Sequence, residues 1–79
     1  MFQGFPTIAV CPVTSHLTGA LPIRIPLPSN ERTGLEKPSE VEIDKIQSLK
    51  IDRVRETIGH VSEEELRTID NAIRLWLDL

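Results

Sequence analysis

The side chains best suited to chemistry in this sequence stand together at Thr14, Ser15 and His16. Hydroxyl and imidazole groups can bind a phosphate and stabilise the charge that develops on it in a transition state. A second interpretation stays open, because hydroxyls at the end of a strand often satisfy the backbone beside them. The triplet therefore predicts either a phosphate-binding site or a strand end that caps itself.

The element that must position this triplet is the apolar run at residues 7–15, TIAVCPVTS. Its length and β-branched composition predict a strand buried on both faces, with Thr14 and Ser15 delivered at its end. Cys11 lies inside the run, so we expect a small buried hydrophobe rather than a reactive thiol. A single cysteine cannot form an intramolecular disulfide, which favours a reducing, cytoplasmic location.

A second group of candidates is basic and lies in the middle of the chain, at Lys45, Lys50, Arg53 and Arg55. These charges are either solvated or in contact with nucleic acid. The formal net charge of −3 argues against a general nucleic-acid coat. Asp44 is interpreted as the partner of a bend or turn, since no second carboxylate stands at a paired spacing. No cysteine–histidine pattern has the spacing of a metal site, and no glycine-rich phosphate loop is present.

The remaining pattern predicts further strands. Residues 21–27 alternate apolar and polar, with two prolines on the outward face, and this predicts an edge strand or a strand that leaves the sheet. Residues 28–39 form a loop rich in turn residues. The alternation at residues 41–44 and 49–52 changes register, which predicts a bulge or bend near Asp44–Lys45. Residues 55–61 are interpreted as a last short strand, in which Gly59 permits a close backbone approach.

A helix is predicted from about residue 63 to about residue 78. Ser62 and Glu65 have the spacing of a capping box. Leu66, Ile69 and Ile73 recur at helical spacing, together with Trp76, and we expect this apolar stripe to pack against the sheet. Trp76 is expected to be either a core residue or a dimer contact.

These elements make one domain over residues 1–79, mainly β with a C-terminal helix (α+β), with strands at about 7–61. Residues 1–23 carry no formal charge, but Pro6 and Pro12 interrupt them, so we expect neither a spanning helix nor an export signal. A chain that opens on a doubly buried strand is expected to be the later part of a larger barrel or sheet.

Several segments, taken in order, resemble the MazF/PemK toxin family. They are VCPVTS at 10–15, RIPL at 24–27, PSEVEIDKIQSL at 38–49, IGHVSEEEL at 58–66 and IDNAIRLWLDL at 69–79. The resemblance implies a small SH3-like β-barrel with a C-terminal helix that forms a homodimer. It also implies a metal-independent endoribonuclease of a toxin–antitoxin module, without cofactors. Such enzymes cut single-stranded RNA, often mRNA, through attack by the neighbouring 2′-OH, and a cognate antitoxin inserts its tail into the substrate groove.

Carried over residue by residue, the resemblance makes Thr14 the catalytic threonine that supports the transition state. It assigns Ser15, His16 and Lys45 to RNA binding. The family's N-terminal Gly-Asp and Arg-Pro motifs, the second with a proton-transfer arginine, have no counterpart here. Arg24 and Arg53 belong to other motifs and do not replace that arginine. We therefore expect an incomplete SH3-like barrel lacking its first strands, inactive alone. The alternatives are a non-catalytic dimerisation or antitoxin-binding module and an inactive remnant.

Overall fold

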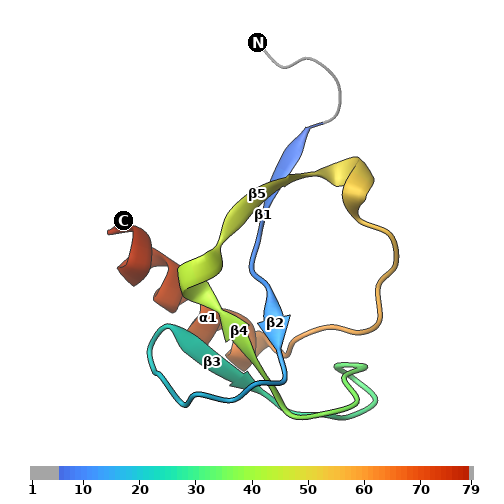
Figure 1. Ribbon diagram of the computed structural model, residues 1–79, viewed down its shortest axis with the longest axis vertical. Helices are drawn as coiled ribbons and strands as arrows, with labels where there is room; N and C mark the ends of the chain where they lie inside the picture. The colour runs from blue at the N-terminus through green and yellow to red at the C-terminus, as the bar shows by residue number, and fades with distance from the viewer. Residues whose placement is uncertain (1–5, 79) are drawn as a thin grey trace.

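The computed structural model describes residues 6–78, which form two small antiparallel sheets and one helix (Figure 1). One sheet pairs β1 (Thr7–Val10) with β5 (Gln47–Lys50). The other has the order β2–β4–β3, with β2 at Val13–Thr14, β4 at Ser39–Glu42 and β3 at Arg24–Leu27. Two 3₁₀ turns, η1 (Ile43–Lys45) and η2 (Ile51–Arg53), flank β5, and α1 (Glu63–Leu77) ends the described chain. Over residues 6–78 the strands do not close into a barrel.

The predicted strand at residues 7–15 is wrong in two respects. It is divided between the two sheets at Cys11–Pro12, and it is not buried on both faces. Three of the four β1 residues are exposed and Val10 is half-buried, because β1 belongs to a sheet of only two strands. Cys11 is half-buried against the core, where burial raises the pKa of its thiol.

The edge strand predicted at residues 21–27 is confirmed as β3, which pairs with β4 alone. Ile25 and Leu27 are buried and Pro26 faces outward, as the alternation requires. The strand begins later than predicted, because residues 21–23 form a turn in which the amide of Ile23 donates to the carbonyl of Ala20. Leu21 is consequently exposed, not buried with Ile25 and Leu27.

The bend predicted near Asp44–Lys45 is present, as the 3₁₀ turn η1 and not as a bulge. The strand predicted at residues 55–61 is wrong, because this segment is irregular and crosses the loop before β4. Gly59 does permit a close approach, since a Cβ atom there would collide with the backbone of Arg32 and Thr33.

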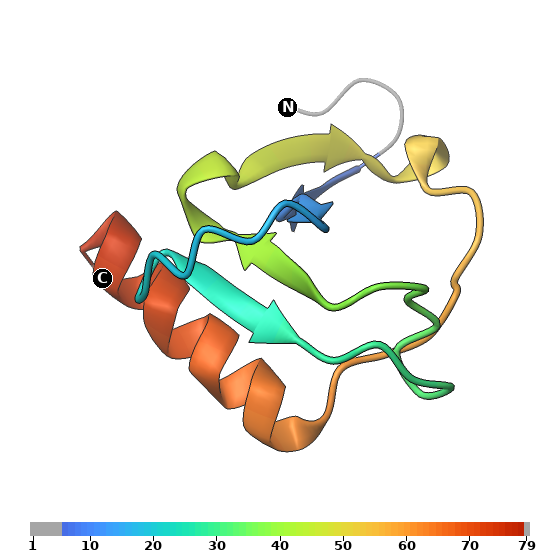
Figure 2. The same cartoon turned by 60° about the horizontal axis from the view of Figure 1, so that its bottom comes forward.

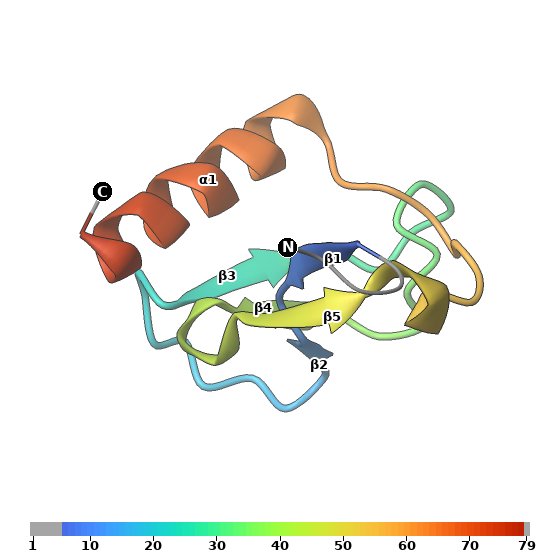
Figure 3. The same ribbon diagram turned by 90° about the horizontal axis from the view of Figure 1, so that it is seen from above.

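Helix α1 begins at the predicted capping box and lies along one side of β3 and η1 (Figures 2 and 3). The amide of Glu65 donates to Ser62 Oγ at 3.0 Å, and the Ser62 amide donates to Glu65 Oε1 at 2.8 Å. Ala72 is buried, and Ile69 and Ile73 pack against the core formed by the following residues: Ile25, Leu27, Val41 and Ile43.

Other members of the expected helix stripe are not buried. Leu66 and Trp76 remain 56% and 48% exposed, because they lie at the two ends of the helix where the sheet no longer covers it. Trp76 is therefore not a core residue of this chain. No helix in residues 6–78 is long and apolar enough to cross a membrane.

Candidate functional site

Thr14 ends β2, and its hydroxyl shapes the turn that follows. Thr14 Oγ1 accepts a hydrogen bond from the His16 amide at 3.1 Å, which confirms that this strand end caps itself. A hydroxyl oxygen that accepts one bond still carries a proton to donate. The Thr14 hydroxyl can therefore cap the turn and still donate a hydrogen bond to a ligand at the strand end.

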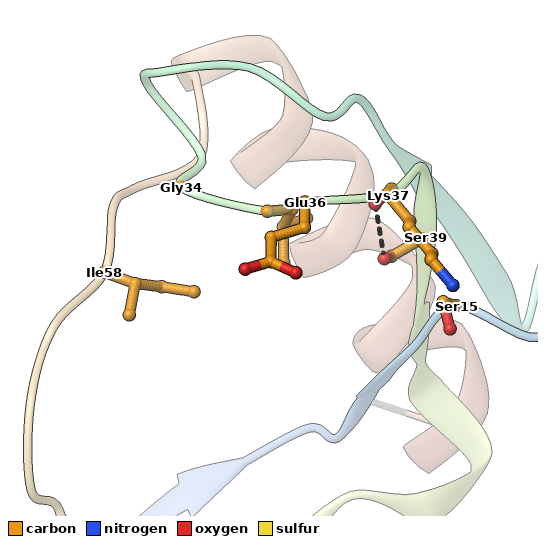
Figure 4. Close-up of a pocket in the computed structure, with 7 residues that line it drawn as sticks. Ser15, Gly34, Glu36, Lys37, Ser39 and Ile58 are labelled. Atoms are coloured by element: carbon orange, nitrogen blue, oxygen red, sulfur yellow. Dashed lines mark hydrogen bonds between the residues drawn. The ribbon is translucent and has the colours of Figure 1, made fainter.

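An open pocket of about 470 Å³ begins at the next residue, Ser15 (Figure 4). Its other lining residues come from the loop before β4, from β4 itself and from the segment before α1: Gly34, Leu35, Glu36, Lys37, Ser39 and Ile58. Figure 4 shows the Lys37 side chain on the Ser15 side of the pocket and Ile58 on the opposite side. Ser39 Oγ donates to the Lys37 carbonyl at 2.9 Å and so fixes the lysine backbone. The pocket thus combines the Lys37 cation and the Ser15 hydroxyl, groups that bind phosphate oxygens, with the carboxylate of Glu36.

The outer wall of the pocket is held by close backbone packing. Gly34 has a φ of 69°, and a Cβ atom there would collide with the Ile58 backbone. Arg32 reinforces this contact by donating to the His60 carbonyl at 3.1 Å. It also pairs with both carboxylate oxygens of Glu65, at 2.8 and 3.0 Å. The guanidinium lowers the pKa of Glu65 to about 2, helped by the Ser62 amide. The wall is consequently tied to the first turn of α1.

Glu40 lies across the β2–β4 ladder from Thr14 and is only 3% exposed. Its carboxylate accepts hydrogen bonds from the Gly19 amide at 2.8 Å and from the Thr18 amide and hydroxyl at 3.1 Å. These donors, the Gly19 amide first, lower the pKa of Glu40. A buried carboxylate therefore secures the loop that follows Thr14.

Comparison with known proteins places this geometry in a family. A family model described as a PemK-like, MazF-like toxin of a type II toxin–antitoxin system matches residues 1–77. The chain belongs to this PemK/MazF-like toxin family. It is also 38% identical over 72 residues to endoribonuclease MazF9 of Mycobacterium tuberculosis, a match that covers 91% of this chain. The chain spans only 60% of the length of MazF9.

Two solved structures of toxins have a similar fold. The M. tuberculosis toxin MazF-mt6 superposes with a TM-score of 0.78 at 26% identity, covering 92% of this chain and 71% of that one. Another solved structure, the crystal structure of a protein titled Mtb toxin, gives a TM-score of 0.74 at 23% identity. This match covers 89% of this chain and 74% of the other chain, and it supports the fold alone. The predicted mainly β fold with a C-terminal helix is confirmed.

Three of the four candidate site residues are neighbours in the chain, and the fourth lies apart from them. Thr14, Ser15 and His16 lie at the end of β2, with His16 exposed. Lys45 lies elsewhere, in η1, which follows the last residue of β4. Ser39, which lines the pocket, is at the first residue of β4. The Lys45 ammonium lies 3.6 Å from Glu42 Oε2 and its side chain is largely exposed.

Asp44 lies in the bend, within η1, but its side chain pairs with Arg24 and not with the turn. Its carboxylate accepts from Arg24 Nε at 3.1 Å, and this hydrogen bond lowers the pKa of Asp44. Arg24 also lies 3.4 Å from Glu42 Oε2, so its charge is already neutralised by carboxylates. Within residues 6–78 no group of three His, Cys, Asp or Glu side chains is placed to hold a metal ion.

Sequence reasoning missed two residues of this site, Lys37 and Glu40. Lys37 stands in a loop rich in turn residues, where a lone lysine resembles any solvated charge. Glu40 alternates with Val41 and resembles an outward-facing strand residue. No local signal separates either of them from surface charge, because their neighbours are distant in sequence.

Proposed function

We propose that this chain forms the threonine-bearing, RNA-binding part of a metal-independent endoribonuclease toxin. The observation that carries the proposal is the capped Thr14 hydroxyl beside a pocket with Ser15 and Lys37. Membership of the toxin family and the 38% identity to endoribonuclease MazF9 support the same assignment. The proposed substrate is single-stranded RNA, mRNA included.

The proposed reaction is attack by a ribose 2′-OH on the adjacent phosphate. The bond from the 2′ oxygen to phosphorus forms and the bond to the 5′ oxygen breaks. The 2′ proton passes to a base and the leaving 5′ oxygen gains a proton, which leaves a 2′,3′-cyclic phosphate and a 5′-OH. Thr14 would donate its hydroxyl proton to a non-bridging oxygen as negative charge develops there.

Ser15 and His16 would contact the RNA beside the scissile phosphate, and Lys37 would neutralise a neighbouring phosphate. Lys45 stays a predicted RNA-binding residue that extends the positive charge beyond the far end of β4. The proposal includes a homodimer, a cognate antitoxin that competes with RNA for the pocket, and a cytoplasmic location.

The first experiment measures binding of a fluorescein-labelled single-stranded RNA by anisotropy at two salt concentrations. We expect Lys37→Ala to weaken binding and to reduce the salt dependence by about one phosphate contact. Arg67→Ala, which removes an exposed positive charge from α1, is the control and should have little effect. Equal affinities for wild type and Lys37→Ala would contradict the pocket as the RNA site.

The second experiment measures cleavage by this chain and by a version extended to the next upstream start codon. We expect poor cleavage by the 79-residue chain, since it has no counterpart of the family's proton-transfer arginine. A positioned acid–base group typically contributes about 10²–10⁴-fold to the rate. In whichever form cuts, Thr14→Ala should reduce kcat by about 10²–10³. Efficient cutting by the short chain would show that the arginine segment is dispensable. A Thr14→Ala variant of normal kcat would exclude the catalytic role of the threonine.

A second candidate is a non-catalytic dimerisation or antitoxin-binding module. It is favoured by large apolar side chains that α1 leaves exposed: Leu66, Leu75, Trp76 and Leu77. Sedimentation of the wild type and of Trp76→Ala tests the dimer, and titration with an antitoxin peptide tests the partner. Peptide binding without RNA binding by either form of the chain would favour this module over the endoribonuclease.

A further inference from the structure

The loop at residues 15–20 is fastened at both ends by side chains of neighbouring strands. Thr14 Oγ1 holds its first turn through the His16 amide. Glu40 holds its far end through Thr18 and Gly19. Because Thr14 and Glu40 are direct partners in the β2–β4 ladder, both attachments originate at one position of the sheet.

The Glu40 carboxylate is satisfied by neutral donors. The Thr18 amide lies 3.1 Å from each carboxylate oxygen, the Thr18 hydroxyl 3.1 Å from Oε1, and the Gly19 amide 2.8 Å from Oε2. Among residues 6–78 no Lys, Arg or His nitrogen lies within 4.0 Å of it. Hydrogen bonds to a buried carboxylate are stronger than neutral ones, so the carboxylate determines the conformation of this loop.

Thr18 extends the same network into the loop. Its hydroxyl donates to Glu40 and accepts from the Ala20 amide at 3.2 Å. Gly19 has a φ of 69°, which lets its amide turn inward toward Glu40. The side chains of Ser15 and His16 are left on the exposed side.

We propose that Glu40 is a positioning residue for RNA recognition, because it holds loop 15–20 in the conformation that presents Thr14, Ser15 and His16 to a phosphate. The proposal rests on the RNA-binding function proposed above. Glu40 itself does not touch RNA, since it is buried beneath the loop. A phosphate there would therefore meet the Thr14 and Ser15 hydroxyls and the His16 imidazole, on a loop whose own amides are held by the carboxylate.

The sign of one substitution separates this role from simple electrostatics. Glu40→Gln removes a negative charge beside an anion site, and charge alone predicts tighter RNA binding. A positioning role predicts weaker binding, because the Gln amide nitrogen would face the N–H donors of Thr18 and Gly19. We expect about a tenfold loss of affinity for RNA. This loss corresponds to a loop that adopts its RNA-binding conformation in about a tenth of the molecules. Glu56→Gln, an exposed residue with the same change of charge, is the control.

Two further measurements keep the test decisive. Amide hydrogen exchange of Thr18 and Gly19 reports the loop directly, and in Glu40→Gln it should accelerate while the β3 amides stay protected. Glu40→Asp retains the charge with a shorter reach, so it should also weaken RNA binding, and it replaces the Gln variant if that one fails to fold.

Unchanged or tighter RNA binding by Glu40→Gln, with accelerated exchange in the loop, would overturn the positioning role. Slow exchange at Thr18 and Gly19 in that variant would overturn the structural premise. Failure of the wild type to bind RNA would refute the proposed function, and with it the role in recognition, whatever the exchange data say about the loop.

Discussion

The sheet β2–β4–β3 and the sheet β1–β5 differ in what surrounds them. β4 has a strand on each side, and Ser39, Glu40 and Val41 are all buried. β1 has a single neighbour, and the apolar residues Ile8 and Ala9 are exposed. The number of neighbouring elements, and not the hydrophobicity of the strand, therefore determines which residues are buried here. A charged residue can be buried in the central strand when hydrogen-bond donors satisfy it, as Thr18 and Gly19 do for Glu40.

The largest expected effect contrasts the two sheets with one kind of substitution. Ile43 follows β4 and is fully buried, so Ile43→Ala should lower the free energy of unfolding by about 2–5 kcal/mol. Ile8→Ala in β1 should cost below about 1 kcal/mol, as expected near the surface. Urea denaturation monitored by circular dichroism measures both. Equal losses would show that the comparison is wrong and that β1 is covered in solution.

The helix that covers the three-stranded sheet provides the next contrast. Ile73 packs against the core, so Ile73→Asp should cost about 3 kcal/mol by burying an unpaired charge. Leu66 lies on the same helix but is exposed, and Leu66→Asp should change the free energy of unfolding by under about 1 kcal/mol. Thermal melts compare the two variants. A large loss at Leu66 would indicate that a partner chain covers that end of α1.

Gly19 and Gly34 test whether the loops, like the two sheets, differ in how closely other parts of the chain surround them. Gly19 and Gly34 both have a φ of 69°, so alanine at either position incurs about 1–2 kcal/mol of left-handed backbone strain. A Cβ atom at Gly19 meets open space, whereas one at Gly34 collides with the Ile58 backbone. We expect Gly34→Ala to destabilise the protein more than Gly19→Ala in chemical denaturation. Similar costs would indicate that residues 54–61 can move away from the loop.

The smallest expected effect is on acid stability. The pKa of Glu65 is lowered to about 2 by Arg32, so its stabilising contribution is present above the ordinary carboxyl pKa near 4.5. That contribution is lost as the pH falls toward about 2. Arg32→Ala should lower Tm by a few degrees at pH 6 and make the acid decline less steep. Arg74→Ala, which breaks the exposed pair with Asp70, should hardly change either quantity.

Local patterns predicted those features whose causes are local. The capping box needs only Ser62 and Glu65, three residues apart, and β3 follows from the alternation of Ile25, Pro26 and Leu27. The bend at Asp44–Lys45 followed from a change of register. In each case the responsible residues are neighbours in the chain, so the sequence contains the relevant geometry.

Features determined by distant residues were not predictable. The exposure of β1 depends on how many strands flank it, and the role of Lys37 depends on where Ser15 and Ile58 are placed. Glu40 finds its donors more than twenty residues earlier, at Thr18 and Gly19. Thr14, Ser15 and His16 could be grouped as candidates from the sequence because they adjoin one strand, whereas Lys45 is separated from them by the length of β4.

The pairing of β1 with β5 also has a consequence for the order of folding. Thr7 pairs with Lys50, whereas Ile25 pairs with Val41 in the other sheet. Closing the longer loop costs more conformational entropy, and few buried contacts compensate for it. The β1 amides should therefore gain protection after those of β4 in pulse-labelled refolding, and earlier protection of β1 would contradict this order. During synthesis, β1 emerges before β5 and must wait unpaired while residues 11–46 follow it.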